Sequence, residues 1–236
     1  MPGTELALNQ VMVQVVDVTQ LAGKLHELKA FLSSEELARL ERYSVAAPRE
    51  MFLAARGALR FLLGQLLDTE PARVTIATHE HGKPFLPGNP GLYFNISHSR
   101  TLALIALARH PVGVDVEYLP RHVDFAAVMR RFFSESEREE WSRFSVPSQQ
   151  HAFFRGWTRK EAILKATGEG IAGLGHTLIS FKPDEPRALR ERLGDPAQSQ
   201  NWIFGDFCPA PDYQAAIALQ APALQLSVQR FSLRGA

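Results

Sequence analysis

Val11-Met-Val-Gln-Val-Val16 and Val112-Gly-Val-Asp-Val-Glu117 are two versions of one pattern, separated by 101 residues. Valine occupies alternate positions of both stretches, which predicts a β-strand with one buried face. Further matches recur at the same offset: Phe31-Leu-Ser-Ser with Phe132-Phe-Ser-Glu, Arg42-Tyr-Ser-Val with Arg143-Phe-Ser-Val, and Phe52 with Phe153. Matches that recur without a gap favour a duplicated unit over a coincidence between two amphipathic helix pairs.

The residues between the two copies predict further helices and strands. Ser33 and Glu36 have the spacing of a capping box, so a helix is expected over about Ser33–Arg42. Other patterns predict a helix from about Arg49 to Leu67, strands at 73–78, 93–96 and 102–108, and a break between strands at 97–100. The two copies would join near His110-Pro111, giving an N-terminal lobe of residues 1–110 and a C-terminal lobe of residues 111–236.

The repeat is informative because the ionisable residues are not repeated. At an offset of 101, the partners of the ionisable residues are Gln14 for Asp115, Val16 for Glu117, Arg60 for Glu161 and Gly64 for Lys165. We therefore expect the second lobe to carry metal chemistry and the first to supply binding surface. A cleft between the lobes is the natural place for a ligand.

Asp115 and Glu117 lie two residues apart in the predicted strand, so their carboxylates project from one face. Two like charges on one face repel each other unless a cation lies between them. The alternative is an exposed strand edge on which both acids are solvated. The strand pattern alone does not separate these two interpretations.

A second stretch, Trp157-Thr-Arg-Lys-Glu-Ala-Ile-Leu-Lys-Ala-Thr-Gly168, has helical composition and a terminating glycine. Glu161 and Lys165 are four residues apart, so they share a helix face and can act on one ligand. The alternative is an ordinary surface ion pair. Lys160 lies on another face and is expected to meet solvent or a ligand phosphate.

Three carboxylates without a neighbouring His–Cys cluster favour Mg²⁺, which prefers oxygen ligands and substrate phosphates. Zinc would require sulfur or imidazole ligands. His79 and His81 share a predicted strand face, but no third zinc ligand is spaced with them, so both are interpreted as surface residues. The acids Asp115, Glu117 and Glu161 are therefore the candidate metal ligands.

A diphosphate bound beside Mg²⁺ also needs cationic side chains. The candidates are Arg56, Lys83, His98 and Lys165. Gly-Lys-Pro turns and single histidines also have ordinary structural roles, which stay open for Lys83 and His98. Neither GxxxxGK[ST] nor GxGxxG occurs in the sequence, which argues against an ordinary nucleoside triphosphate or dinucleotide fold.

Composition narrows the class of protein. The chain has 236 residues, of which 45% are hydrophobic, and a net charge of +1, so no overall field favours nucleic acid or a membrane surface. A single cysteine fits a reducing cytoplasm. Neither a signal-peptide pattern nor a run of about 18 apolar residues is present. We expect a cytoplasmic protein that binds neither nucleic acid nor a membrane.

Five motifs occur in order: Gly82-Lys-Pro, Phe94-Asn-Ile-Ser-His-Ser, Gly113-Val-Asp-Val-Glu, Arg131-Phe-Phe-Ser and the stretch from Trp157 to Gly168. Together they resemble the 4′-phosphopantetheinyl transferases, in particular the monomeric, double-lobed surfactin-synthetase-activating (Sfp) type. The likeness covers about residues 40–185. It implies an α+β fold with two pseudo-symmetric lobes, each a small, mainly antiparallel sheet packed with helices.

The resemblance implies a transferase of the holo-[acyl-carrier-protein] synthase type. Such an enzyme moves the 4′-phosphopantetheine arm of coenzyme A to a serine of an apo acyl or peptidyl carrier protein and releases adenosine 3′,5′-bisphosphate. The implied metal ligands are Asp115, Glu117 and Glu161, and the implied coenzyme A contacts are Arg49, Arg56, Lys83, Pro84, Ser97, His98 and Lys165. The implied catalytic residues are Glu161, Lys165 and His98, with Glu161 acting as the base directly or through a metal-bound water.

Two alternatives belong to other functional classes. One is a homologue that binds coenzyme A or a carrier without transferring anything, and the intact acids and Lys165 count against it. The other is a Mg²⁺-dependent diphosphate hydrolase, in which water takes the place of the serine. The carrier itself, whether of fatty-acid, polyketide or peptide synthesis, is not specified by these residues.

Overall fold

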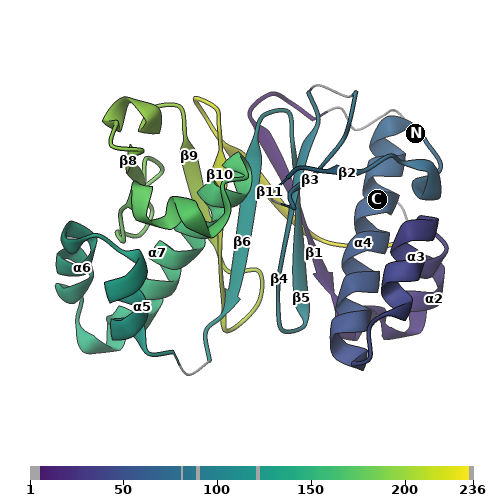
Figure 1. Cartoon of the computed structure of the whole chain (residues 1–236), viewed down its shortest axis with the longest axis horizontal. Helices are drawn as coiled ribbons and strands as arrows, with labels where there is room; N and C mark the ends of the chain where they lie inside the picture. Colours follow the sequence, from purple (N-terminus) through teal and green to yellow (C-terminus); the bar gives the residue numbers. More distant parts are fainter. Residues whose placement is uncertain (1–5, 81, 89–90, 121–122, 234–236) are drawn as a thin grey trace.

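In the computed structural model, two β-sheets pack face to face and helices cover their outer faces (Figure 1). The structure describes residues 6–80, 82–88, 91–120 and 123–233. In this part of the chain the first sheet has the strand order β11-β1-β5-β4 and the second has the order β6-β10-β9. Two short hairpins, β2-β3 and β7-β8, stand apart from them.

The elements have the following bounds. The strands are β1 Gln10–Asp17, β2 Ala77–Thr78, β3 Pro84–Phe85, β4 Tyr93–Ser99, β5 Leu102–Ala108, β6 Val112–Tyr118, β7 Thr177–Ile179, β8 Leu189–Arg192, β9 Ile203–Phe207, β10 Tyr213–Leu219 and β11 Gln225–Arg230. The α-helices are α1 Val18–Leu21, α2 Leu25–Lys29, α3 Ser34–Glu41, α4 Ala46–Leu67, α5 Phe125–Phe132, α6 Glu135–Ser142 and α7 Val146–Thr167. Short 3₁₀ turns are η1 Ala22–Lys24, η2 Pro71–Arg73, η3 Gly170–His176 and η4 Pro196–Ser199.

The two halves of the chain repeat one order of elements. Strands β1, β5 and β4 are neighbours in the first sheet, as β6, β10 and β9 are in the second, and all these pairs are antiparallel. A short helix, a 22-residue helix and a small hairpin follow the first strand of each half. The expected α+β fold with two pseudo-symmetric halves is therefore confirmed.

The short helices begin with the same local structure in both halves. Ser33 and Glu36 form a capping box at α3, and Ser134 and Glu137 form one at α6. In each box the serine hydroxyl accepts a backbone N–H bond from the glutamate, and the glutamate carboxylate accepts one from the serine. Each box satisfies backbone donors that the first helical turn leaves unpaired.

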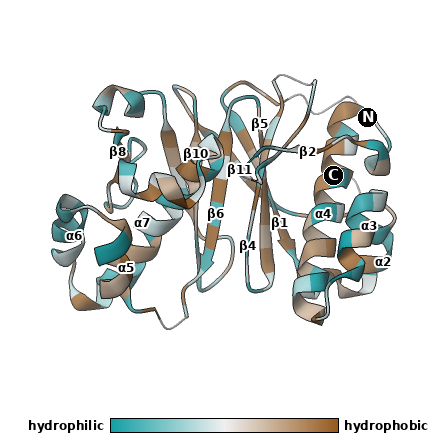
Figure 2. Cartoon of the chain, viewed as in Figure 1, coloured by the Kyte–Doolittle hydropathy of each residue, from teal (hydrophilic) through white to brown (hydrophobic). Residues whose placement is uncertain are grey.

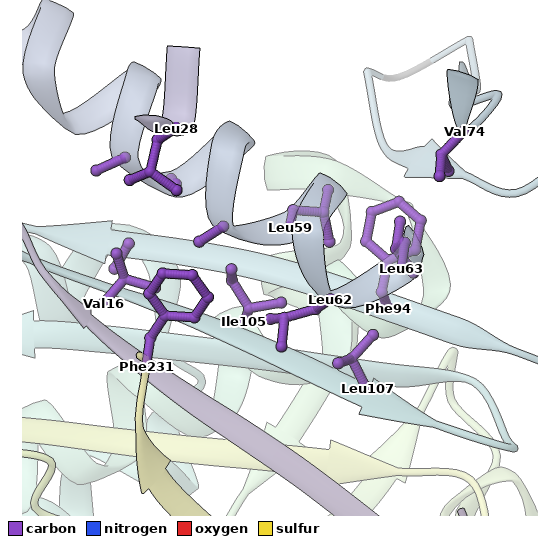
Figure 3. Close-up of a cluster of buried hydrophobic side chains, with 14 of the residues drawn as sticks. Val16, Leu28, Leu59, Leu62, Leu63, Val74, Phe94, Ile105, Leu107 and Phe231 are labelled. Carbon is purple, nitrogen blue, oxygen red and sulfur yellow. The ribbon is translucent and has the colours of Figure 1, made fainter. Parts of the chain in front are cut away.

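Within the described residues, buried apolar side chains fill the spaces between the layers. Strand β5 is buried throughout because alternate residues face the helices and the other sheet. Figure 2 shows the central strands mostly in brown and much teal on α3, α5 and α6. Leu59, Leu62 and Leu63 of α4 lie over Ile105 and Leu107 of the first sheet (Figure 3).

The end of the chain returns to the first sheet. Strand β11 pairs in parallel with β1, and Phe231 is buried in the core beneath α4 (Figures 1 and 3). Residues 225–231, which we expected in the C-terminal lobe, therefore pack with the N-terminal half. The boundary at residues 110 and 111 stays a prediction.

Two local expectations were wrong. The segment expected as a strand over 73–78 forms η2 and only the two-residue strand β2, because Pro71 starts a 3₁₀ turn there. The break expected at 97–100 is shorter than expected, because β4 continues to Ser99 and only the turn at Arg100 and Thr101 separates it from β5; Arg100 has a φ of 53°. In the described ranges, no helix has both the length and the apolar character needed to cross a membrane.

Candidate active site

The acid pair lies on the face of β6 that is covered by α7. Val112, Val114 and Val116 point into the core between the sheets, so the alternate residues Asp115 and Glu117 point toward the helix. Gly113 lets the helix come close, because a Cβ atom at this position would lie 1.9 Å from the carbonyl oxygen of Ala162. Helix α7 can therefore bring Glu161 and Lys165 to the two acids.

Asp115 is 4% exposed, and two side chains bond the same carboxylate oxygen. Its Oδ1 atom accepts hydrogen bonds from Lys165 Nζ at 2.6 Å and from the hydroxyl of Ser97 at 2.9 Å. Lys165 Nζ also donates to the hydroxyl of Ser97, at 2.8 Å. The other oxygen, Oδ2, is buried and has no hydrogen-bond partner. A buried carboxylate oxygen without a partner is costly, so this atom is a site at which a cation would be favourable.

Glu161 lies close enough to the acid pair for their charges to interact. Burial raises the pKa of Glu161, the negative charges of Asp115 and Glu117 raise it further, and Lys165 lowers it. The three acids thus share one region of unfavourable negative charge. As the side chains lie, no group of three His, Cys, Asp or Glu among the described residues is arranged to hold an ion. Lys165 supplies positive charge at Asp115 instead.

Strand β4 joins the site from the first sheet. Its side chains Asn95, Ser97 and Ser99 accept backbone N–H bonds from Val114, Val116 and Tyr118 of β6, at 2.9, 3.4 and 3.1 Å. These bonds favour an extended β4 as far as Ser99, because only an extended strand places the hydroxyls of Ser97 and Ser99 opposite the N–H groups of Val116 and Tyr118. The hydroxyl of Ser99 also donates to Glu117 Oε2 at 3.4 Å, and Trp157 Nε1 donates to Glu117 Oε1 at 3.1 Å.

His98 projects to the opposite face of β4 from Ser97 and keeps solvent access. Partial burial lowers the pKa of His98, and the charge of Lys165 lowers it further, against a smaller opposite effect of Asp115. His98 is therefore electrostatically coupled to the acid site. A neutral imidazole at this position can donate to, or accept from, a ligand.

Lys83 and Pro84 line a pocket of ≈ 650 Å³ between the two halves. One wall is formed by the β2-β3 hairpin and β4, and the other by Ala166, Thr167 and Gly168 at the end of α7. Lys83 Nζ donates to the carbonyl oxygen of Ala166, and burial lowers the pKa of Lys83 to about 8. The pocket thus begins one residue beyond Lys165, and Asp115, Glu117 and Glu161 are not among its lining residues.

Arg56 and Arg49 lie away from this pocket. Arg56 forms an ion pair with Glu36 of α3, with Nε 2.7 Å from Oε1. Arg49, in the first turns of α4, lines a smaller pocket of ≈ 320 Å³ with Glu41 and Tyr43. Neither arginine is among the residues that line the pocket at Lys83. His79 stacks on Phe85 at the edge of that pocket, and His81 lies outside the described residues.

Lys160 does not meet solvent, contrary to expectation. Its side chain is 1% exposed, and its Nζ atom donates to Glu137 and to the carbonyl oxygens of Phe132 and Leu174. Burial lowers the pKa of Lys160, and Glu137 acts in the opposite direction. Consecutive residues of a helix point in different directions. Because Glu161 faces β6, Lys160 points into the core instead.

Arg60 occupies the matching place in the first half, which corrects the register of the repeat. Arg60 binds the capping-box residue Glu36 and the carbonyl oxygens of Pro71, Ala72 and Val74. It therefore corresponds to Lys160, at an offset of 100, and not to Glu161. Helices α4 and α7 begin 100 residues apart, whereas α3 and α6 begin 101 apart. The connection between the short and the long helix is one residue shorter in the second half, and a constant offset of 101 does not take this difference into account.

Sequence reasoning assigned no role at the acids to Ser99 or Trp157, although both lie inside recognised motifs and both bond Glu117. The spacing of Asn95, Ser97 and Ser99 at every second position was a signal for one polar strand face. No sequence pattern indicated that this face would meet β6, because the two strands are joined through side chains rather than by backbone pairing.

Comparison with known proteins places the chain. Residues 111–218 match the family model described as the 4′-phosphopantetheinyl transferase superfamily, and residues 21–110 match the one described as 4′-phosphopantetheinyl transferase, N-terminal. The 4′-phosphopantetheinyl transferase HetI of Nostoc sp. is 38% identical over 222 residues, which cover 92% of this chain and 91% of the relative. The transferase psf-1 of Bacillus pumilus is 28% identical, with 90% and 89% covered, and Sfp of Bacillus subtilis is 27% identical, with 61% and 63% covered. On these matches, the chain belongs to the 4′-phosphopantetheinyl transferase family.

Proposed function

We propose that the chain transfers the 4′-phosphopantetheine arm of coenzyme A to a serine hydroxyl of an apo carrier protein, releasing adenosine 3′,5′-bisphosphate. One observation carries the chemistry. Asp115, Glu117, Glu161 and Lys165 meet where β6, β4 and α7 come together, and one buried oxygen of Asp115 has no partner. This set of residues combines carboxylates for a cation with an ammonium group for phosphate oxygens.

Mg²⁺ fits the residues at this place. The unpartnered Oδ2 of Asp115 and the mutual repulsion of the three acids both favour a hard, doubly charged cation. Asp115, Glu117 and Glu161 would hold it. When bound, Mg²⁺ would neutralise charge on the diphosphate of coenzyme A. Lys165 would then turn from Asp115 toward the phosphate oxygens, because the cation replaces the positive charge that Lys165 supplies.

Coenzyme A would lie between the halves, beside the acids. The pocket that begins at the end of α7 is large enough for part of the molecule, and Lys83 and Pro84 line it. Lys83 would hold a phosphate group, and His98 and Lys165 would contact the diphosphate nearer to the acids. Ser97 remains a proposed contact, and so do Arg56 and Arg49 on α4.

The transfer step needs a base that takes the proton of the serine hydroxyl as its oxygen attacks phosphorus. The serine hydroxyl of the carrier attacks the phosphorus that bears pantetheine, and the bond from this phosphorus to the departing adenosine 3′,5′-bisphosphate breaks. The serine proton passes to Glu161, directly or through a bridging water, because a serine hydroxyl is a weak nucleophile without a base. Lys165 and His98 stabilise the phosphate oxygens as negative charge develops on them.

A single copy of the chain would suffice for this arrangement. Its two lobes would be residues 1–110 and 111–236, with β11 of the second packed on the sheet of the first, and the family models meet at the boundary between residues 110 and 111. Because both walls of the pocket come from one chain, we propose a monomer. Cys208 is exposed and free, which fits a reducing compartment such as the cytoplasm.

The test is to incubate the purified chain with coenzyme A, Mg²⁺ and a panel of apo acyl and peptidyl carriers, and to weigh the carriers. A carrier should gain the mass of one 4′-phosphopantetheinyl group, and the Asp115→Ala variant should lose this activity while it stays folded. Loss of coenzyme A without a gain of carrier mass would indicate a diphosphate hydrolase. Binding of coenzyme A with neither change would indicate a homologue without transferase activity.

A further inference from the structure

The two serines of β4 share a two-sided hydrogen-bonding arrangement. The hydroxyl of Ser97 accepts the N–H of Val116 and donates to the carboxylate of Asp115. Two residues on, the hydroxyl of Ser99 accepts the N–H of Tyr118 and donates to Glu117. Each serine thus bonds the carboxylate of one acid and the backbone of the residue that follows it.

The arrangement follows from the position of β6 in its sheet. Strand β6 pairs with β10 along one side, and β4 borders the other side without backbone pairing. Buried N–H groups on that side need acceptors, and the β4 side chains supply them. A hydroxyl can accept and donate at once, whereas a carbonyl oxygen only accepts. Serine therefore suits the two positions next to the acids.

These bonds also determine which carboxylate oxygens remain available. Ser97 and Lys165 both bond Oδ1 of Asp115, and Oδ2 is left buried and unpartnered. Ser99 and Trp157 bond different oxygens of Glu117 and so restrict its rotation. Hydrogen bonds to metal-binding side chains orient them, and their removal commonly lowers metal affinity tenfold to a hundredfold.

We propose that Ser97 and Ser99 are positioning residues that hold Asp115 and Glu117 in the orientation that a divalent cation requires. This inference rests on the proposed function. It gives both hydroxyls a role within the protein and adds Ser99, which the family resemblance did not assign. The acids stand on the second half of the chain and the serines on the first, so the orientation of the acids depends on the contact between the halves.

Asn95 provides a matched control. It accepts the N–H of Val114 at 2.9 Å in the same way as the serines, but it donates to none of the three acids. Asn95→Ala should therefore lower stability through the lost β4–β6 contact and leave metal binding unchanged. Ser97→Ala and Ser99→Ala should lower both.

The experiment measures Mn²⁺ binding by electron paramagnetic resonance, with coenzyme A at a saturating concentration for each variant and no carrier, together with thermal unfolding. We expect a tenfold to hundredfold higher Kd for Mn²⁺ in Ser97→Ala and Ser99→Ala, a Kd within twofold of wild type in Asn95→Ala, and a near-normal Kd in Ser99→Thr, which keeps the hydroxyl. If an alanine variant does not fold, the corresponding cysteine variant replaces it, because a thiol has nearly the same size and is a weak hydrogen-bonding group.

An unchanged Kd in both serine variants, beside normal binding by the wild type, would overturn this inference and leave the proposed function standing. An equal rise in Kd for Asn95→Ala would also overturn it, because the effect would then come from the strand contact alone. Absence of Mn²⁺ binding by the wild-type protein would overturn the proposed metal site, and this inference with it.

Discussion

At the scale of single residues, the burial of Lys83 bears directly on its proposed role in binding coenzyme A. Its amine lies at the end of α7, where the Ala166 carbonyl oxygen accepts one of its hydrogen bonds. Because burial removes water from the charged form, the pKa of Lys83 falls from 10.5 to about 8. The charge needed to bind a phosphate is therefore lost in a range of pH in which an exposed lysine would keep it.

This shift predicts a pH dependence of coenzyme A binding. Below about pH 8 Lys83 is protonated and attracts phosphate, and above it the neutral amine does not. The KM for coenzyme A should therefore rise as the pH increases from about 7 to about 9.5, on either side of this pKa. Lys83→Arg should lack this rise, because arginine stays charged throughout the range. The measurement is KM against pH at saturating carrier and Mg²⁺, and an identical rise in both proteins would show that another group is responsible.

At the scale of elements, the close approach of α7 to β6 brings the helix residues to the strand residues. The approach depends on Gly113, where any side chain would meet the backbone of Ala162 and Ala166. Backbone atoms of a helix cannot move aside as a flexible side chain can. The glycine thus determines the distance between the acids of β6 and the side chains Glu161 and Lys165.

Gly113→Ala should consequently displace α7. We expect a loss of about 1–3 kcal/mol in the free energy of unfolding, as for other overpacked sites. We also expect a fall in kcat of about a hundredfold, because small displacements of catalytic groups are costly. Urea unfolding and steady-state kinetics would measure both. Gly23→Ala is the control, since a Cβ atom at Gly23 would have no neighbouring atom within 4 Å, and a similarly large loss there would contradict the explanation.

The buried cations on the long helices connect several elements in each half. Lys160 joins α7 to the capping box of α6 and to the carbonyl oxygens of Phe132 and Leu174. Arg60 joins α4 to the capping box of α3 and to the segment after η2. Each cation therefore sets how its long helix lies against the elements around it, and in the second half that helix carries Glu161.

Lys160→Met should leave Glu137 buried without its ion-pair partner. The side chains of Lys160 and Glu137 are 1% and 3% exposed, so water cannot replace the lost interaction. We expect a cost of about 3–5 kcal/mol in the free energy of unfolding, measured with urea. Arg60→Met is the counterpart in the first half and should be similarly destabilising. A raised KM for coenzyme A with normal stability would instead restore the sequence-based view that Lys160 meets a phosphate.

On the scale of the whole molecule, the two halves are joined by more than one connection. Strand β4 meets β6 through side chains, the two sheets share a core, and β11 carries the end of the chain back to β1. Phe231, just after β11, is 8% exposed and packs edge-on against Phe61 of α4 at 5.8 Å between ring centroids. The last strand therefore closes the core of the first half.

Phe231→Ala should destabilise the protein although the residue takes no part in the acid site. Removing a large buried ring typically costs about 3–5 kcal/mol, which thermal or urea unfolding would detect. Activity per folded molecule should stay near the wild-type value. Val228→Ala is the matched control, because Val228 is 41% exposed on β11. Equal stability of the two variants would show that the chain end does not hold the first core together.

Local patterns in the sequence determined much of this protein. The duplicated strands, the capping box at Ser33, the pair Asp115 and Glu117 on one strand face, and the helix end at Gly168 all depend on residues close together in the chain. Such features follow from strand and helix periodicity and from the geometry of helix ends. The composition of the acid group, three carboxylates with a nearby lysine, was also readable from the residues alone.

Tertiary structure decided the features that depend on which surfaces meet. The burial of Lys160, the pairing of Arg56 with Glu36, the double role of Ser97 and Ser99, and the return of β11 to the first sheet all depend on contacts between separate elements. A periodic pattern shows which face of an element is polar or apolar, but it does not identify the partner of that face. The partner is selected by the packing of whole layers, because buried polar groups must find their hydrogen bonds wherever the layers come together.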